Sequence, residues 1–549
     1  MATTVGDTAY RERTLFARKA TGLVKGWAVR DAFIYSAFSI NLITLGLFIF
    51  SYAVFVPDGS LMWAVILSGA YLLFQVVTYS SLIAAMPRAG GDYVWISRVL
   101  GGGIGFVLAV CGWWFILWHW VPIYANILNV EIFVPLASIV GADGFASFFS
   151  EPRGLFTASI ITALLASFVI SLGMRTYARI QKFCFYGGVI GLLFMFVLLL
   201  FNSKADFISA FNAESQSVLG APANAYQGTL DAAATGNSSV ADFGAVKGVF
   251  LLIPFILFFN LWSNWGATLY GEVRGASDFR KNIYAMGGAL IATTIAAVVM
   301  FLLFAKTFGW DFYNAANNAY WGQPALYDYV ESPPVTAFPY PGLLASFLMD
   351  GAFWQFLLVG LLSLWFFGWV GTVFLSSTRV VFAAAFDRIL PESAAKVSRN
   401  GVPFVAIALM LIPSLPIAYF YAYDAEFFSW TLSATFVIAV TFAGSAIAAM
   451  LLPWLKPDIY NASPIARYKV AGLPIITVAA AGFLVILGFA IYEWITNATY
   501  GIDWTTARNS FYYMFALYGL ALAIYVVSRI YRRSQGIDMK MVHSEIPVE

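Results

Sequence analysis

Polar side chains interrupt one long apolar segment near the middle of the chain, at a place where they could form hydrogen bonds inside a membrane. Pro254 removes a backbone donor, and Asn260, Ser263, Asn264 and Gly266 follow it. Backbone groups freed by a helix break can face a cavity but not lipid. The rings around this break could cover a ligand or stack on a cationic group, and they could equally pack against one another: Phe258, Phe259, Trp262 and Trp265.

Titratable side chains are scarce in the apolar segments, because they are expensive in hydrocarbon. His119, between Trp118 and Trp120, is the one group near an interior that titrates around neutral pH. It is a candidate proton-coupling residue, with an interfacial or hydrogen-bonded histidine as the alternative. Glu131 and Glu493 are expected to face the outer interface.

The segments that must position these groups are long enough to cross a bilayer. Hydrophobic residues make up 61% of the sequence and charged residues 11%. This composition predicts an all-α integral membrane protein. Twelve spans are expected, at 31–55, 61–85, 104–128, 155–173, 182–201, 246–269, 284–305, 353–376, 403–422, 428–452, 472–495 and 510–530.

The distribution of lysine and arginine predicts the orientation, since cytoplasmic loops retain these residues. With an inside start, the cytoplasmic pieces carry 25 basic residues, and the outer loops carry Arg153, Lys204, Lys247, Lys306 and Arg508. We therefore expect a multi-pass protein of the cell membrane with both termini in the cytoplasm. The basic side would face anionic lipid, which leaves no nucleic-acid interpretation. The first thirty residues have no apolar core, so no signal peptide is expected.

The two cysteines, Cys111 and Cys184, each lie within a predicted span, so neither a disulfide framework nor a metal cluster is expected. No phosphate-binding loop is present, and no cofactor is predicted. Asn237 and Asn497 each begin a glycosylation sequon in an outer loop, and their modification stays open.

Three connections carry specific motifs. The stretch from Pro87 to Arg98 reads Pro-Arg-Ala-Gly-Gly-Asp-Tyr and continues to a second arginine. Gly271-Glu272-Val273-Arg274 follows the sixth span. The third runs from Ser377-Thr378-Arg379 through Asp387-Arg388-Ile389-Leu390-Pro391 to Gly401-Val402-Pro403. Together these motifs resemble those of the amino acid–polyamine–organocation (APC) permeases, over about residues 28–455.

The resemblance implies a LeuT-like fold, in which a five-plus-five inverted repeat is followed by two extra C-terminal helices. It divides the chain into a cytoplasmic tail (1–30), a first repeat (31–201), an outer loop (202–245), a second repeat (246–455), two further spans (456–530) and a cytoplasmic tail (531–549). The outer loop 306–350 within the second repeat would act as a lid, or as a passive cover. The loop 202–245 has no such counterpart and is expected to be mobile.

The resemblance also implies a substrate site where the first and sixth spans break. The first span departs from the family, because it lacks the usual glycine pair. Either Thr44–Phe48 or Leu42–Thr44 can be placed on the motif, and the polar residues could cap half-helices or act as glue between helices. The predicted substrate-binding residues are Ser39, Asn41, Thr44, Gly46, Phe259, Asn260, Trp262 and Asn264.

The remaining implied residues concern gating and coupling. Gly90, Gly91 and Tyr93 would form a gating loop at the inner surface. Thr372 and Ser376 lie on one helical face and could bind sodium, or bond back to the preceding turn. The coupling ion, a proton or sodium, is left undecided.

The sequence therefore predicts a secondary transporter and not an enzyme. It would move amino acids or related small organic amines by alternating access, through ion-coupled symport or substrate exchange. The alternative is a non-transporting substrate sensor, or a membrane subunit of a larger complex, on the same fold. The sequence indicates no oligomeric state.

Overall fold

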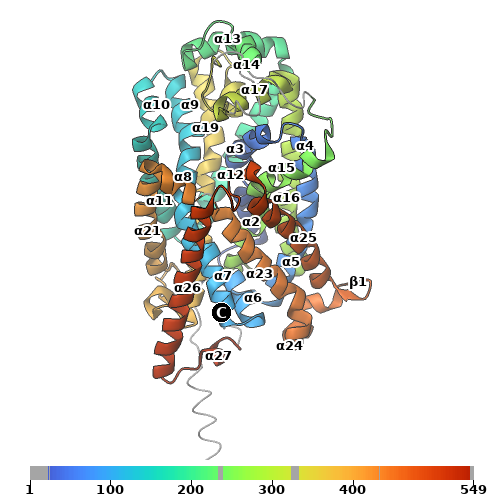
Figure 1. Cartoon of the computed structure of the whole chain (residues 1–549), viewed down its shortest axis with the longest axis vertical. Coiled ribbons are helices and arrows are strands. Elements are labelled where there is room, and N and C mark those ends of the chain that lie inside the picture. Colours follow the sequence, from blue (N-terminus) through green and yellow to red (C-terminus); the bar gives the residue numbers. More distant parts are fainter. Residues whose placement is uncertain (1–22, 24, 233–238, 323–332, 432, 545–549) are drawn as a thin grey trace, which may run out of the picture.

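The computed structural model describes residues 23, 25–232, 239–322, 333–431 and 433–544. Long helices run side by side and form one bundle (Figure 1). Twelve helical stretches in these residues are long and apolar enough to cross a membrane, which confirms the all-α class and the number of spans. They are Val29–Phe55, Leu61–Ala85, Gly102–Ile139, Pro152–Ser171, Met174–Phe201, Val246–Glu272, Phe279–Trp321, Ala352–Phe386, Phe404–Tyr423, Ala425–Leu455, Ile475–Thr496 and Arg508–Ser534.

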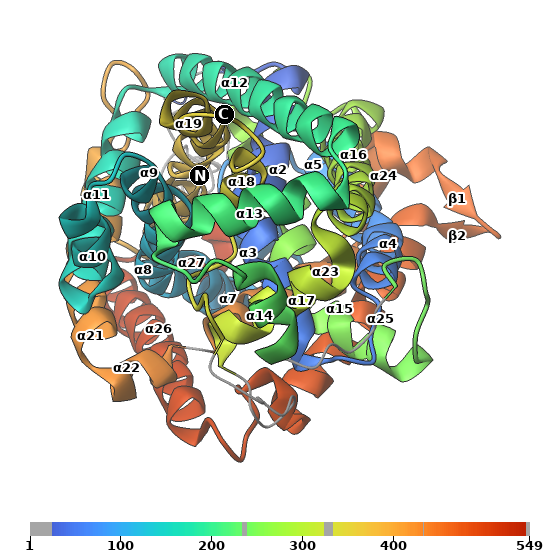
Figure 2. The ribbon, with the colours of Figure 1, turned by 90° about the horizontal axis from the view of Figure 1, so that it is seen from above.

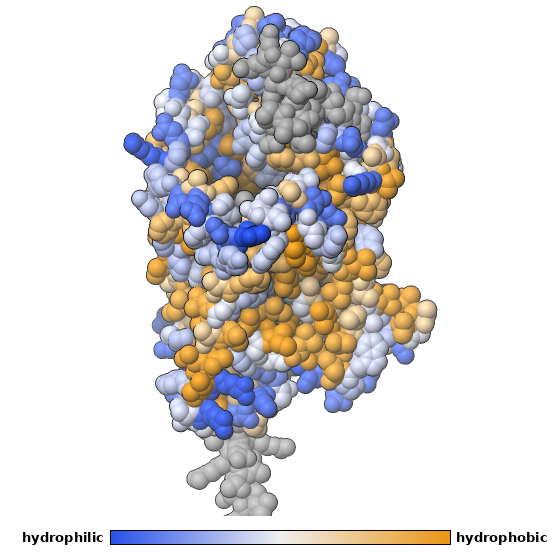
Figure 3. All heavy atoms as spheres, in the orientation of Figure 1, coloured by the Kyte–Doolittle hydropathy of each residue, from blue (hydrophilic) through white to orange (hydrophobic). Residues whose placement is uncertain are grey.

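On the face seen in Figure 3, hydrophobic side chains gather in a broad patch in the lower half of the bundle, and hydrophilic ones lie at both ends. Peripheral helices carry exposed apolar side chains. On the fifth span, for example, Phe183 is 68% exposed and Phe201 is 80% exposed. Large apolar side chains can be exposed in this way because lipid, not water, surrounds them.

Of the first five spans, three are built from several helical pieces and two are single helices. Their elements are α2 (Val29–Ile40), π-helix η1 (Leu42–Gly46), α3 (Leu47–Phe50), 3-10 helix η2 (Ser51–Phe55), α4 (Leu61–Tyr71), α5 (Leu73–Ala85), α7 (Gly102–Val110), π-helix η3 (Cys111–Phe115), α8 (Ile116–Leu128), π-helix η4 (Asn129–Phe133), α9 (Val134–Ile139), α11 (Pro152–Ser171) and α12 (Met174–Phe201). The short helices α6 (Asp92–Val99) and α10 (Asp143–Ser150) connect them.

The next five spans include the second broken segment. Their elements are α15 (Val246–Asn260), 3-10 helix η5 (Leu261–Glu272), α16 (Phe279–Phe304), π-helix η6 (Ala305–Gly309), α17 (Trp310–Trp321), α18 (Pro341–Ser346), α19 (Ala352–Trp369), α20 (Thr372–Phe386), 3-10 helix η7 (Glu392–Ala395), α21 (Phe404–Tyr423), α22 (Ala425–Trp430) and α23 (Ala434–Leu455).

The remaining elements lie at the ends of the bundle or form the last two spans. They are α13 (Lys204–Leu219), α14 (Ala225–Ala232), α24 (Pro457–Ala462), 3-10 helix η8 (Pro464–Arg467), the antiparallel pair β1 (Lys469–Val470) and β2 (Leu473–Pro474), α25 (Ile475–Thr496), 3-10 helix η9 (Ala498–Tyr500), α26 (Arg508–Ser534) and α27 (Met539–Val542). We call the side with α6 and α27 the inner side, and the opposite side, covered by α13, the outer side (Figures 1 and 2).

The outer loops are more structured than the sequence indicated. The segment expected to be a mobile loop forms α13 and α14, and α13 begins with Ser203 and Asp206 capping each other. Aromatic side chains fix both helices to the lid helix α17, with Tyr226 stacked on Phe312 at 4.4 Å between ring centroids. Burial of these rings overrides the polar composition that suggested mobility.

Candidate functional site

The first span breaks at Asn41. Its backbone is left-handed, with φ 56° and ψ 73°, and it ends α2. The side-chain oxygen of Asn41 accepts a hydrogen bond from the Thr44 backbone N–H at 3.1 Å, and its amide nitrogen donates to the Thr44 hydroxyl at 2.5 Å. Asparagine tolerates this backbone and caps the next helical piece. Ser39, by contrast, bonds back to the Tyr35 carbonyl oxygen at 2.7 Å.

The sixth span changes from α-helix to 3-10 helix at Asn260–Leu261. Polar residues of the second span hold this change in place. Asn260 donates to the Ser68 hydroxyl at 2.6 Å, and Gln75 donates to the Leu261 carbonyl oxygen at 2.7 Å. Twelve residues of 3-10 helix is unusually long, since such runs rarely exceed one turn.

A cavity of about 800 Å³ opens between the two broken spans toward the outer side. Aromatic side chains form most of its wall, and Tyr124 stacks on Trp369 there with ring centroids 3.5 Å apart. No Asp, Glu, Lys, Arg or His of the described chain lines it. The lining includes Leu45, Phe48, Ile49, Tyr52, Trp120, Tyr124, Asn126, Phe255, Phe258, Tyr320, Trp321, Trp369, Tyr421 and Thr435.

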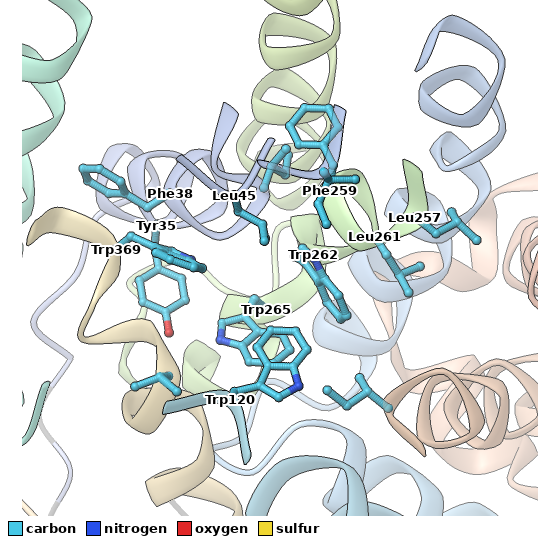
Figure 4. Packing of buried hydrophobic residues seen from close by; sticks show 14 of the residues in the cluster. Tyr35, Phe38, Leu45, Trp120, Leu257, Phe259, Leu261, Trp262, Trp265 and Trp369 are labelled. Atoms are coloured by element: carbon cyan, nitrogen blue, oxygen red, sulfur yellow. The ribbon is translucent and has the colours of Figure 1, made fainter. Parts of the chain in front are cut away.

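Three tryptophans, Trp120, Trp262 and Trp265, pack together next to this cavity (Figure 4). Trp120 lines the cavity and lies parallel to Trp265 at 5.5 Å and edge-on to Trp262 at 5.0 Å. Trp262 and Trp265 are buried, and each indole N–H is bonded, to the carbonyl oxygens of Phe258 and Thr372 respectively. We call these three rings the tryptophan floor of the cavity.

None of the eight predicted substrate-binding residues lines the cavity. They lie directly behind it, at the two breaks. Leu45 lines the cavity between the buried Thr44 and Gly46, and a Cβ on Gly46 would lie 3.0 Å from the Phe259 ring. Asn264 lies deeper, beside the Tyr79 hydroxyl. Their assignment to substrate binding stays a proposal.

The predicted gating loop lies against the inner ends of two spans. Gly90 has φ +96° and donates to the Thr268 carbonyl oxygen at 2.8 Å, and a Cβ there would lie 2.5 Å from that of Ala383. A Cβ on Gly91, with φ +38°, would lie 3.0 Å from the Thr268 backbone. The loop therefore touches both the sixth and the eighth span, as only glycine permits.

Ion pairs and a hydrogen bond join elements at the inner side of the bundle. Arg379 donates to Glu272 at 2.7 and 3.2 Å, which joins the inner ends of the eighth and sixth spans. Asp31 at the start of the first span pairs with Lys182 of the fifth at 2.7 Å. Tyr93 donates to Asp387 at 2.7 Å. These contacts join the spans at the inner side, whereas the cavity lies in the outer half of the bundle.

Residues 32–522 match the family model described as amino acid permease. The chain belongs to the amino acid permease family. A comparison with curated proteins found no match. Membership of a transport family and twelve apolar spans make this permease a multi-pass membrane transporter of amino acids or related substrates, and not an enzyme.

The permease places its predicted ion-coupling residues in two different environments. Ser376 donates to the Trp265 carbonyl oxygen at 2.7 Å and meets the Tyr35 hydroxyl at 2.8 Å, and Thr372 meets the Tyr124 hydroxyl at 3.0 Å. These hydroxyls thus bond across spans and not back to the preceding turn. They join the eighth span to the first, third and sixth behind the cavity.

His119 points away from the cavity. Its Nε2 lies 2.7 Å from the Tyr513 hydroxyl of α26, and its Nδ1 lies 3.0 Å from the Phe115 carbonyl oxygen. This placement matches the hydrogen-bonded alternative. Proton coupling through His119 stays an untested proposal, and nothing in its position favours it.

The expectation for Glu131 was wrong. This side chain does not face the outer interface, because it is 0% exposed within η4, inside the third span. The sequence signal was a single carboxylate in a long apolar run, and periodicity alone could not tell which way it pointed.

Asp92 was missed by the sequence analysis. It begins α6, outside the spans, and its carboxylate accepts hydrogen bonds from Tyr79 at 2.7 Å, Ser445 at 2.6 Å and Trp113 at 3.1 Å. Burial raises the pKa of Asp92 to about 6, and these hydrogen bonds oppose the rise. The residue joins the second, third and tenth spans to the gating loop.

The last described helix, α27, also reaches the gate. Met539 and Val542 are buried, and the ring of His543 lies 3.3 Å from the Tyr93 hydroxyl and 3.9 Å from Asp387. A Cβ on Gly102 would collide with this ring at 2.4 Å. No sequence motif indicated this contact.

Proposed function

We propose that the permease is a secondary active transporter of neutral amino acids with apolar or aromatic side chains, working by alternating access. One observation carries the substrate class: the aromatic cavity has no charged lining residue among those the structure describes. The partition of basic residues supports a cell-membrane protein with cytoplasmic termini.

The lining disfavours substrates with charged side chains. An aromatic ring attracts a cation by about 2 kcal/mol when both groups are shielded from water. An ammonium group taken out of water without a counter-ion loses more than that. An apolar side chain of the substrate gains about 25 cal/mol per Å² buried against the same rings. The wall therefore selects apolar over cationic or acidic side chains.

The amino and carboxylate groups of such a substrate need polar partners, and the two breaks supply them. Backbone groups near Asn41 and Asn260 are freed from regular helix directly behind the wall. Half-helix termini can bind charged groups through backbone dipoles without a buried counter-ion. This arrangement supports the eight predicted residues as the binding region around a substrate held above the tryptophan floor.

Uptake into liposomes tests this function. The purified permease would be given labelled phenylalanine, tryptophan, leucine, lysine, putrescine and glutamate in turn, with proton and sodium gradients varied separately. We expect uptake of the first three and not of the last three. Uptake of lysine or putrescine without phenylalanine would refute the substrate class.

A charge-introducing variant sharpens the test. Phe258→Asp places a carboxylate in the wall and should shift preference toward lysine, while Phe353→Asp, on an exposed apolar side chain away from the cavity, should not. Stabilisation of the protein by the same amino acids without any counterflow would favour the sensor or membrane-subunit alternative.

A further inference from the structure

Glu131 lies on the same face of the third span as the cavity wall. Tyr124, Leu128 and Glu131 follow at helical spacing, and Tyr124 lines the cavity. Glu131 therefore stands about 10 Å further toward the outer side, in the π-helical turn η4. Single π-helical turns within α-helices are frequent at functional sites.

The carboxyl group of Glu131 is buried without compensation. Both of its oxygens lack a hydrogen-bond partner among the described residues, and none of the ion pairs found there includes it. An ionised carboxylate in hydrocarbon surroundings is costly unless it is paired. The packing around Glu131 thus suits the neutral, protonated acid and not the carboxylate.

Three tyrosines of the segment expected to act as a lid lie near this carboxyl group. Tyr313 and Tyr320 on α17 and Tyr340 before α18 lie within electrostatic range of Glu131. The Tyr313 hydroxyl is itself buried and without a partner in the described part of the chain. Tyr320 also lines the cavity, so one residue of α17 lies both in the cavity wall and within electrostatic range of Glu131.

Among the described residues of the main elements packed on η4, no base or cation offers an alternative partner to Glu131. The main elements packed on η4 are α8, α9, α10, α11 and α19. The titratable residues of these elements are His119 and Tyr124 on α8, Asp143 on α10 and Arg153 on α11. Asp143 and Arg153 are exposed to solvent, and His119 bonds to Tyr513 on another face.

We propose that Glu131 is a proton-binding site that couples proton uptake from the outer side to closure of the lid. When the lid lifts, water reaches the carboxyl group, its O–H bond breaks and the proton passes to water. Rebinding of a proton from outside restores the neutral acid, over which α17 and Tyr340 can pack. By linkage, protons favour the state that buries this group.

This inference rests on the proposed transport function, and uptake at varied external pH with internal pH held constant tests it. Wild-type uptake should rise at least about threefold as the external pH falls from about 8 to about 5. Glu131→Gln copies the neutral acid, so it should keep substrate counterflow and lose the pH dependence. A matched control is Glu493→Gln on the outer side, which should behave as wild type.

Two results would overturn the proposal: unchanged pH dependence in Glu131→Gln, or loss of its counterflow. A second measurement needs no transport. Infrared difference spectroscopy of wild type against Glu131→Gln at neutral pH should show the band of a protonated carboxyl group. A carboxylate band instead would refute the site, whereas that protonated band without any uptake would refute the transport function alone.

Discussion

Arg98 and Asp387 form a doubly hydrogen-bonded ion pair at 2.5 and 2.9 Å, although 289 residues separate them in sequence. Both side chains are buried, and the pair joins α6 to the inner end of the eighth span. Because α6 directly follows the Gly90–Gly91 turn, this contact holds the predicted gating loop against the inner end of the eighth span.

Asp387→Asn should strongly destabilise the inner gate. It leaves the Arg98 guanidinium buried without a counter-charge, which costs about 3–5 kcal/mol. Thermal unfolding in detergent measures the loss. Replacing both partners, as Arg98→Met with Asp387→Leu, should recover much of it. Asp278→Asn is the control, since its pair with Lys281 is solvent-exposed and its loss should change little.

Gly90→Ala should impair uptake more than membrane insertion, because its methyl group would collide with Ala383. The double variant Gly90→Ala with Ala383→Gly removes the collision and should restore part of the uptake. Gly141→Ala separates strain from crowding, since Gly141 also has positive φ but open space around it. Equal uptake by Gly90→Ala and wild type would rule out the close contact as a gate element.

Trp120→Ala should raise the half-saturation constant for an aromatic substrate about tenfold, since Trp120 lines the cavity and holds its floor. Trp262→Ala removes a ring one layer below and should raise the constant by less. Concentration-dependent uptake measures both. The reverse order would place the substrate below the tryptophan floor and not above it.

Asp92 should make stability depend on pH. Its pKa is about 6 in the closed gate, against an ordinary value of 3.8. Protons therefore bind preferentially to the closed, folded form, so this contribution is present below about pH 4 and is lost as the pH rises through about 6. The melting temperature of the wild type should therefore fall as the pH rises from about 4 to about 6, and that of Asp92→Asn should lack this fall. Asp458→Asn on the exposed α24 should keep the same dependence of melting temperature on pH as the wild type. The same dependence in Asp92→Asn would show that Asp92 does not cause it.

Local sequence was sufficient for features that depend on local chemistry. Apolar runs predict spans because lipid excludes unpaired backbone groups. Asn41 was one of several polar residues that indicated the first break, and its side-chain oxygen replaces a missing partner of the Thr44 backbone N–H. Asn260 indicated the second break, where its side chain bonds to that of Ser68. Glycines at the gating loop were identified by motif. The amphipathic α13 was not, because its stability comes from aromatic contacts with α17 that composition does not reveal.

Features that depend on distant pairing escaped prediction. Arg98 and Asp387 each stood in a quoted motif, yet nothing in either motif indicated the other as its partner. Asp92 is surrounded by donors from three spans, and Glu131 by side chains that leave it unpaired. Whether a buried carboxylate has hydrogen-bond partners depends on how all the spans pack together, and a short stretch of sequence does not reveal that packing.

The position of α27 bears on how the permease is made. His543 follows all twelve spans in the chain, whereas its neighbours precede the last spans and are synthesised earlier: Gly102, Tyr93 and Asp387. The contact between tail and gate can therefore form only after the last span has left the ribosome. A chain that ends before α27 would lack this contact with Tyr93 and Asp387.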